Sequence, residues 1–151
     1  MTTLTDSYHI LIDAPAEKIF DYLADLTRHS EWSGGPLKVE AASPGPVAVG
    51  SQYLSVGDLP MQKNRRNELR ITELQSPYRL AFVAKDPGLG EVTHQFSLTP
   101  QGSATLVTRR VTVNAPPLMA FMLQTFVHPL VDKPMMDKAL AALKAKMESG
   151  G

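Results

Sequence analysis

The sequence predicts an α+β fold in which a curved antiparallel sheet of six to seven strands surrounds a long C-terminal helix. Two observations lead to this prediction. Residues 37–114 form a series of short β-type runs separated by turn residues, and residues 117–149 hold the longest stretch of helical character. Because the connections between runs are short, successive strands are expected to pair antiparallel, with the helix covering one face.

The composition suits one domain over residues 1–151 that buries its own core. Lys and Arg total 15 and Asp and Glu total 15, so no nucleic-acid partner is expected. The chain has no cysteine, which excludes disulfides and thiolate metal sites and suits a cytoplasmic protein. The first residues lack the basic and apolar segments of a signal peptide, so a cytoplasmic location is predicted.

The N-terminal part is expected to form one strand followed by two short helices. Ser7–Asp13 is rich in β-branched and aromatic residues and is predicted to be the strand. Pro15 and Glu17 favour a first helical turn, and an apolar stripe continues the helix to Ala24. A second short helix is predicted to end near Trp32.

Six further strands are predicted, each bounded by Gly, Pro, Asp or Ser turn chemistry. They are Lys38–Ala42, Ser51–Val56, Arg65–Leu74, Arg79–Lys85, Glu91–Thr99 and Ala104–Asn114. Apolar and polar residues alternate along these runs, which indicates one dry and one wet face. Arg66, Glu68 and Arg70 alternate in charge on the polar side and predict a solvated surface.

The C-terminal helix is expected to change character along its length. Its second half is amphipathic, whereas residues 118–127 have only Gln124 and Thr125 as polar breaks and should be wrapped by the sheet. Pro129 and Pro134 each remove an amide donor and predict a kink or short break. The apolar run is shorter than the roughly 18 residues that span a bilayer, so stable membrane insertion is not expected.

A hollow between this helix and the sheet would hold a few polar groups among apolar ones, which is typical of a small-molecule site. The side chains expected to line it lie on the inward strand faces, on the helix or beside the short second helix. The predicted ligand-binding residues are Trp32, Tyr53, Asn67, Phe82, His94, Phe96, Arg109, Met119, Met122 and Phe126.

Four of these residues have more than one interpretation. His94 is either a proton relay or a core histidine with a hydrogen-bonded partner. A buried Arg109 needs a carboxylate, a ligand anion or water, although a register slip of one residue would place Arg110 inward instead. Tyr53 either donates to a ligand or anchors the sheet. Trp32 either gates the cavity mouth or fills one end of the core.

No metal or cofactor is expected. Histidines at positions 9, 29, 94 and 128 form no His-x-x-x-His pair. The glycines of the segment Gly88–Gly90 lie between predicted strands and do not open a helix, which argues against a dinucleotide site. Walker and Gly-x-Ser-x-Gly patterns do not occur in the sequence.

Five motifs follow one another along nearly the whole chain. They are Ile12–Phe20 leading to Trp32, Val49–Ser51 before a strand, Pro77–Leu80, Phe96–Pro100 before a glycine turn, and Leu143–Glu148. In this order the chain resembles the SRPBCC, or START–Bet v 1, helix-grip superfamily, and within it the polyketide cyclase/dehydrase and lipid transport branch. The resemblance implies a cavity for apolar or polycyclic molecules between sheet and helix. It carries over no catalytic residue, because the superfamily shares no catalytic signature.

Three functions remain open from the sequence. The first is a binder of a hydrophobic, ring-containing, polyketide- or lipid-like molecule. The second is a cofactor-free cyclase or dehydratase with His94 or Tyr53 as acid or base and Arg109 holding an enolate or carboxylate. The third is a protein-interaction module, which an apolar patch on the outer sheet face would favour. The sequence decides neither whether the chain is an enzyme nor whether it forms a homodimer.

Overall fold

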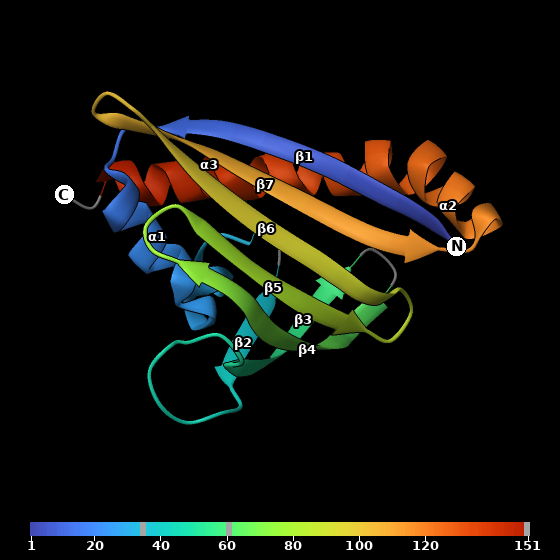
Figure 1. Cartoon of the computed structure of the whole chain (residues 1–151). Helices are drawn as coiled ribbons and strands as arrows, with labels where there is room; N and C mark the ends of the chain where they lie inside the picture. The colour runs from blue at the N-terminus through green and yellow to red at the C-terminus, as the bar shows by residue number, and fades with distance from the viewer. Residues whose placement is uncertain (34–35, 60–61, 150–151) are drawn as a thin grey trace.

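The computed structural model describes residues 1–33, 36–59 and 62–149 of the chain. Seven antiparallel strands form one curved sheet, and the C-terminal helical segment runs along its concave side (Figure 1). The strands are β1 (Thr2–Ile12), β2 (Leu37–Ala41), β3 (Gln52–Leu59), β4 (Gln62–Gln75), β5 (Arg79–Asp86), β6 (Gly90–Gln101) and β7 (Ala104–Ala115). The helices are α1 (Ala16–Ala24), η1 (Leu26–Glu31), α2 (Pro117–Met122), η2 (Leu123–Asp132) and α3 (Lys133–Ser149). The predicted α+β helix-grip arrangement is confirmed.

The strand order is β1-β7-β6-β5-β4-β3-β2. Strands β2 to β7 form the predicted meander, in which each strand pairs with its neighbour in sequence. The exception is β1, which crosses to the far edge and pairs with β7 from Thr2 opposite Ala115 to Ile12 opposite Thr105. This pairing places the N-terminal strand beside the strand that leads into the C-terminal helix (Figure 1).

The alternation of side chains along the strands follows the prediction. Leu80 of β5, Phe96 of β6 and Val107 of β7 are buried on the concave face and pack in the main core, which also includes Leu140 and Leu143 of α3. The charged residues Arg66, Glu68 and Arg70 are exposed on the outer face, as predicted.

The register of β7 settles which of its two arginines faces inward. Arg109 is buried, with 9% of its surface exposed, whereas Arg110 is exposed on the other side of the strand. Because successive side chains alternate between the two faces of a sheet, only one of the two can reach the concave side. The alternative register, with Arg110 inward, is therefore wrong.

The predicted break in the C-terminal helix takes the form of a ten-residue π-helix. Segment η2 joins α2 to α3 and contains Pro129 in its interior. Its wider hydrogen-bond spacing replaces the regular α-helical ladder at the position where the proline lacks a donor. No helix of the described residues is long and apolar enough to cross a membrane.

The apolar first half of this helical segment faces away from the sheet, so the prediction that the sheet wraps it is wrong. Met119, Met122 and Phe126 are 39%, 52% and 53% exposed. Only Ala120 of α2, and no residue of η2, is buried. A run that is apolar nearly all round has no hydrophobic phase, so its composition does not indicate which side faces inward. The helical segment is instead held against the sheet by α3. Its buried residues are Ala139, Leu140, Leu143 and Met147.

A matched pair of leucines on the same helical segment tests this arrangement. Leu143→Ala should lower the free energy of unfolding by about 2–5 kcal/mol, because Leu143 is fully buried. Leu130→Ala should change it by no more than about 0.5 kcal/mol, because Leu130 is 73% exposed. Urea unfolding followed by circular dichroism measures both changes. Equal losses in the two variants would contradict the outward orientation of η2.

Candidate ligand-binding site

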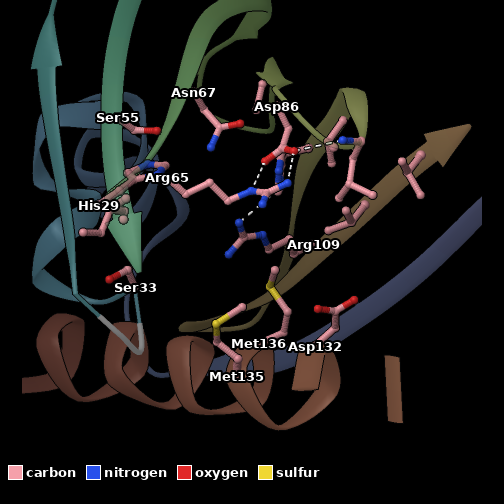
Figure 2. Close-up of a pocket in the computed structure, with 18 of the residues that line it drawn as sticks. His29, Ser33, Ser55, Arg65, Asn67, Asp86, Arg109, Asp132, Met135 and Met136 are labelled. Atoms are coloured by element: carbon pink, nitrogen blue, oxygen red, sulfur yellow. Dashed lines mark hydrogen bonds and ion pairs between the residues drawn. The ribbon is translucent and has the colours of Figure 1, made fainter. Parts of the chain in front are cut away.

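A cavity of about 320 Å³ lies between the concave face of the sheet and the helical segment. Its volume falls at the lower end of the range of small-molecule sites, about 300–1,000 Å³. Side chains from β1 to β7, from the η1 region and from η2 and α3 contribute to the lining. Figure 2 shows polar side chains on the sheet wall with Asp132, Met135 and Met136 on the helix opposite.

Aromatic rings form one end of the cavity. His94 on β6 is the register partner of Phe82 on β5, and their rings stack with centroids 4.8 Å apart and planes 13° apart. The ring of His29, at the end of η1, lies 4.9 Å from the ring of Trp32 and 5.8 Å from that of Phe82. Together these rings offer flat apolar surfaces on which another ring can stack.

Arg109 lies against this aromatic end. Its guanidinium carbon is 5.6 Å from the Trp32 ring and 5.2 Å from the Phe96 ring, and its Nη2 donates to Nδ1 of His94 at 3.1 Å. Its Nε is buried without a hydrogen-bond partner in the described part of the chain. Burial lowers the pKa of Arg109 to about 10, so the side chain is still positively charged near neutral pH.

Both histidines at this end are neutral near pH 7. A guanidinium can only donate, so Nδ1 of His94 accepts and the proton of His94 is on Nε2. Burial, followed by the charge of Arg109, lowers the pKa of His94 well below its ordinary value. Burial also lowers the pKa of His29 to about 4, and its Nε2 donates to the Leu23 carbonyl at 2.8 Å.

A second arginine in the cavity wall is paired. Nε of Arg65 on β4 donates to Oδ2 of Asp86 at 2.7 Å, and its Nη2 donates to Oδ1 of the same carboxylate. Oδ1 of Asp86 also accepts from the amides of Gly88 and Leu89 at 2.8 and 2.9 Å, which fixes the β5–β6 turn. Burial alone would raise the pKa of Asp86, but the hydrogen bonds from Arg65 and the two amides outweigh it and lower the pKa.

The helix presents its polar side to the cavity. Gln124, His128 and Asp132 recur every four residues and all line it. Nε2 of His128 lies 3.3 Å from Oδ1 of Asp6 on β1. Burial raises the pKa of Asp132, and the nearby Asp6 adds to the rise while His128 opposes it. Burial, together with Asp6, raises the pKa of Tyr8 to about 12, so its phenol is neutral.

The structure brings together half of the ten predicted ligand-binding residues. Trp32, Asn67, Phe82, His94 and Arg109 line the cavity.

The other five predicted residues lie elsewhere. Tyr53 and Phe96 are buried in the core and are not part of the lining, so Tyr53 is not placed to act on a molecule in the cavity. Burial, followed by the nearby Asp25, raises the pKa of Tyr53. Met119, Met122 and Phe126 are on the outer side of the helical segment, for the reason given above.

Several polar residues of the lining were not predicted, and three signals would have found most of them. Arg65 has the same strand parity as Asn67, and Asp86 the same parity as Phe82. The four-residue spacing of the polar breaks in the helix indicates one inward stripe. The polar residues of the lining that were not predicted include Asp6, Tyr8, His29, Arg65, Asp86, Gln124, His128 and Asp132.

A sequence profile of the family described as polyketide cyclase / dehydrase and lipid transport matches residues 1–148. The chain belongs to this family. No curated protein sequence matches the chain at a significant level. The resemblance drawn from the five motifs is thereby confirmed at the level of the family and the fold.

Three solved structures illustrate how this polyketide cyclase/dehydrase and lipid transport family member relates to known proteins. A START superfamily protein from Mycobacterium smegmatis has 15% identity and a TM-score of 0.74, with 95% of this chain and 97% of that chain covered. The di-domain ARO/CYC BexL of the BE-7585A biosynthetic pathway has 15% identity and a TM-score of 0.75, with coverage of 99% and 51%. Norcoclaurine synthase from Thalictrum flavum has 13% identity and a TM-score of 0.74, with coverage of 98% and 88%. At these identities the likeness shows a common fold.

The Arg65–Asp86 pair gives this family member a testable acid sensitivity. Asp86→Asn should lower the free energy of unfolding by about 1–3 kcal/mol at neutral pH, because hydrogen bonds to a charged group are weakened. The pKa of Asp86 is lower in the folded chain than in the unfolded chain. The charged carboxylate therefore contributes fully to the free energy of unfolding above about pH 4, and this contribution is lost as the pH falls through the pKa of the folded chain. Urea unfolding of both proteins between neutral and acidic pH should show the difference shrinking. A difference that is constant with pH would contradict this role.

Proposed function

We propose that the chain binds a small, apolar, ring-containing molecule in the cavity between the sheet and the C-terminal helical segment. The observation that carries the proposal is the cavity itself, with its volume of about 320 Å³ and its aromatic end. The aliphatic side chains Leu69, Val92, Val111 and Val113 continue the apolar surface along the sheet. Burying an apolar molecule against such surfaces is favourable because it removes both partners from water.

The lining also supports the proposal that the ligand contains a ring. The stacked Phe82 and His94 rings and the Trp32 ring present planar faces at one end. Met135 and Met136, at the start of α3, provide flexible and polarisable contacts on the opposite wall. A planar ligand would therefore find rigid surfaces on one side and adaptable ones on the other.

A cofactor-independent cyclase or dehydratase is the second proposal, and it is supported by the enzymes that share the fold, the ARO/CYC BexL and norcoclaurine synthase. In this chain the acid-base role would fall to His94, because Tyr53 is outside the cavity. With its pKa far below neutral, His94 is a weak base whose Nε2–H can donate a hydrogen bond. Binding is therefore the better supported function.

The hypothesis of a protein-interaction module is the least supported. It required an apolar patch on the outer sheet face, where Arg66, Glu68, Arg70 and Arg110 are exposed. Among the described apolar side chains that are both large and exposed, Leu11 and Leu54 lie on strands, whereas the largest group is on the C-terminal helical segment. That group comprises Leu118, Met119, Phe121, Met122, Phe126 and Leu130.

Thermal unfolding with a ligand panel tests the binding proposal. With 2-naphthol, the flavonoid naringenin and oleic acid, at least one ring compound should stabilise the chain, by about 2.7 kcal/mol at 100 times its Kd. Val92→Trp should remove the effect by filling the cavity that Val92 lines. Thr93→Trp, which alters the next residue and is outside the lining, is the matched control. A panel without any stabilising compound, or stabilisation that survives Val92→Trp, would refute the proposal.

Product analysis separates binding from turnover. Any compound that stabilises the chain should be recovered unchanged after prolonged incubation, as measured by liquid chromatography and mass spectrometry. If instead a product forms, and His94→Ala abolishes its formation while the affinity is retained, the enzymatic alternative is correct.

A further inference from the structure

We propose that the ligand of this cavity carries a carboxylate and that Arg109 binds it. The inference rests on the proposed function, namely that a small apolar molecule occupies the cavity, and it adds the chemical class of that molecule. The ligand is then a ring-containing acid, with its ring at the aromatic end and its carboxylate on the guanidinium.

The hydrogen bonding of Arg109 is incomplete. A guanidinium has five N–H donors, and the structure pairs Arg109 through one hydrogen bond, to the neutral His94. Its Nε, although buried, has no partner in the described residues. The Trp32 and Phe96 rings favour a cation electrostatically but do not neutralise its charge. A buried charge without a counter-ion is costly, so the free chain lacks a stabilising contact at this position.

Arg109 differs in its partners from Arg65. The same cavity wall holds Arg65 in a two-point hydrogen bond with the Asp86 carboxylate, the geometry that best satisfies a guanidinium. Figure 2 shows Arg109 between this pair and the helix side chains Asp132 and Met136. The chain therefore supplies a carboxylate to Arg65. Arg109 has no carboxylate partner among residues 1–33, 36–59 and 62–149.

The other acidic groups that line the cavity in the described part of the chain do not form an ion pair with Arg109. Tyr8, the register partner of Arg109 on β1, is a neutral phenol that can donate to a carboxylate and does not compete with one. The Asp6 carboxylate lies against His128. Asp132 and Asp58 line the cavity without forming an ion pair with Arg109. The position of a counter-ion for Arg109 is thus left to the cavity's occupant.

The position of Arg109 also fixes how an acid would lie. His94 holds Nη2 from one side and is itself stacked on Phe82, so the guanidinium is oriented before any ligand binds. A planar carboxylate matches the fork of the remaining N–H donors. The Trp32 ring, which lies beside Arg109 and lines the cavity, would then contact the apolar body of the same molecule, which favours an aromatic or alicyclic monocarboxylate.

Calorimetric titration with 2-naphthoic acid and 2-naphthamide tests the assignment, because the two compounds share a ring system and differ in charge. The wild-type chain should bind the acid about 10- to 100-fold more tightly than the amide, the range expected for a hydrogen bond to a charged group. Arg109→Met should remove this preference by weakening the acid and leaving the amide unchanged. Arg109→Lys, which keeps the charge but loses the fork, should give an intermediate preference.

Arg110→Met is the matched control, since it removes the neighbouring arginine from the exposed outer face. It should leave the preference intact. The comparison of acid with amide on the wild-type chain does not depend on the folding of any variant.

Three other outcomes would contradict, in turn, the carboxylate, the role of Arg109 and the proposed function. Equal affinity for acid and amide would overturn the carboxylate assignment and leave the proposed function standing. A preference for the acid that survives Arg109→Met would overturn the role of Arg109. Failure of both compounds to bind the wild-type chain would contradict the proposed function, and this assignment with it.

Discussion

The pairing of β1 with β7 is the contact on which the rest of the structure depends. It joins segments about a hundred residues apart and sets Tyr8 directly opposite Arg109. It also supports the C-terminal helix, because Nζ of Lys144 donates to the Leu11 carbonyl at 3.0 Å and the Asp13 amide donates to Glu148 at 2.8 Å. Without this edge, the cavity would lack one wall and α3 would lack part of its base.

The cavity combines a mainly apolar lining with several ionisable groups, and the structure gives most of these a local solution. Asp86 is paired with Arg65, His128 lies next to Asp6, and the two histidines at the aromatic end are neutral. Arg109 is the exception, because a guanidinium keeps its proton even when burial lowers its pKa. Arg109 cannot lose its charge, so its counter-ion must come from another molecule. In this respect it differs from Asp86 and from the two neutral histidines.

Side-chain alternation along the strands was sufficient to predict the sheet and its buried faces, whereas the choice between Arg109 and Arg110 as the inward residue required the register seen in the structure. It works because one face of the sheet is dry, so a slip of one residue would expose the whole core. The helix could not be oriented in the same way. Burial of its first half was inferred from composition, whereas the structure turns the sparse polar residues Gln124, His128 and Asp132 inward. Asp86 was missed because it ends β5, and Arg65 because it began the predicted strand Arg65–Leu74, at positions where turn and strand patterns overlap.

The reversed polarity of η2 affects how a molecule could reach the interior. A wall segment usually resists displacement because moving it would expose apolar side chains to water. Here Phe126 and Leu130 already face the solvent, and no residue of η2 is buried. Displacing this ten-residue stretch would therefore expose fewer buried apolar side chains than displacing α3, whereas parting the strands would break their backbone ladders. The cavity thus has one wall that the sheet's backbone hydrogen bonds hold together and another wall, η2, that is held mainly through the buried residues of α3.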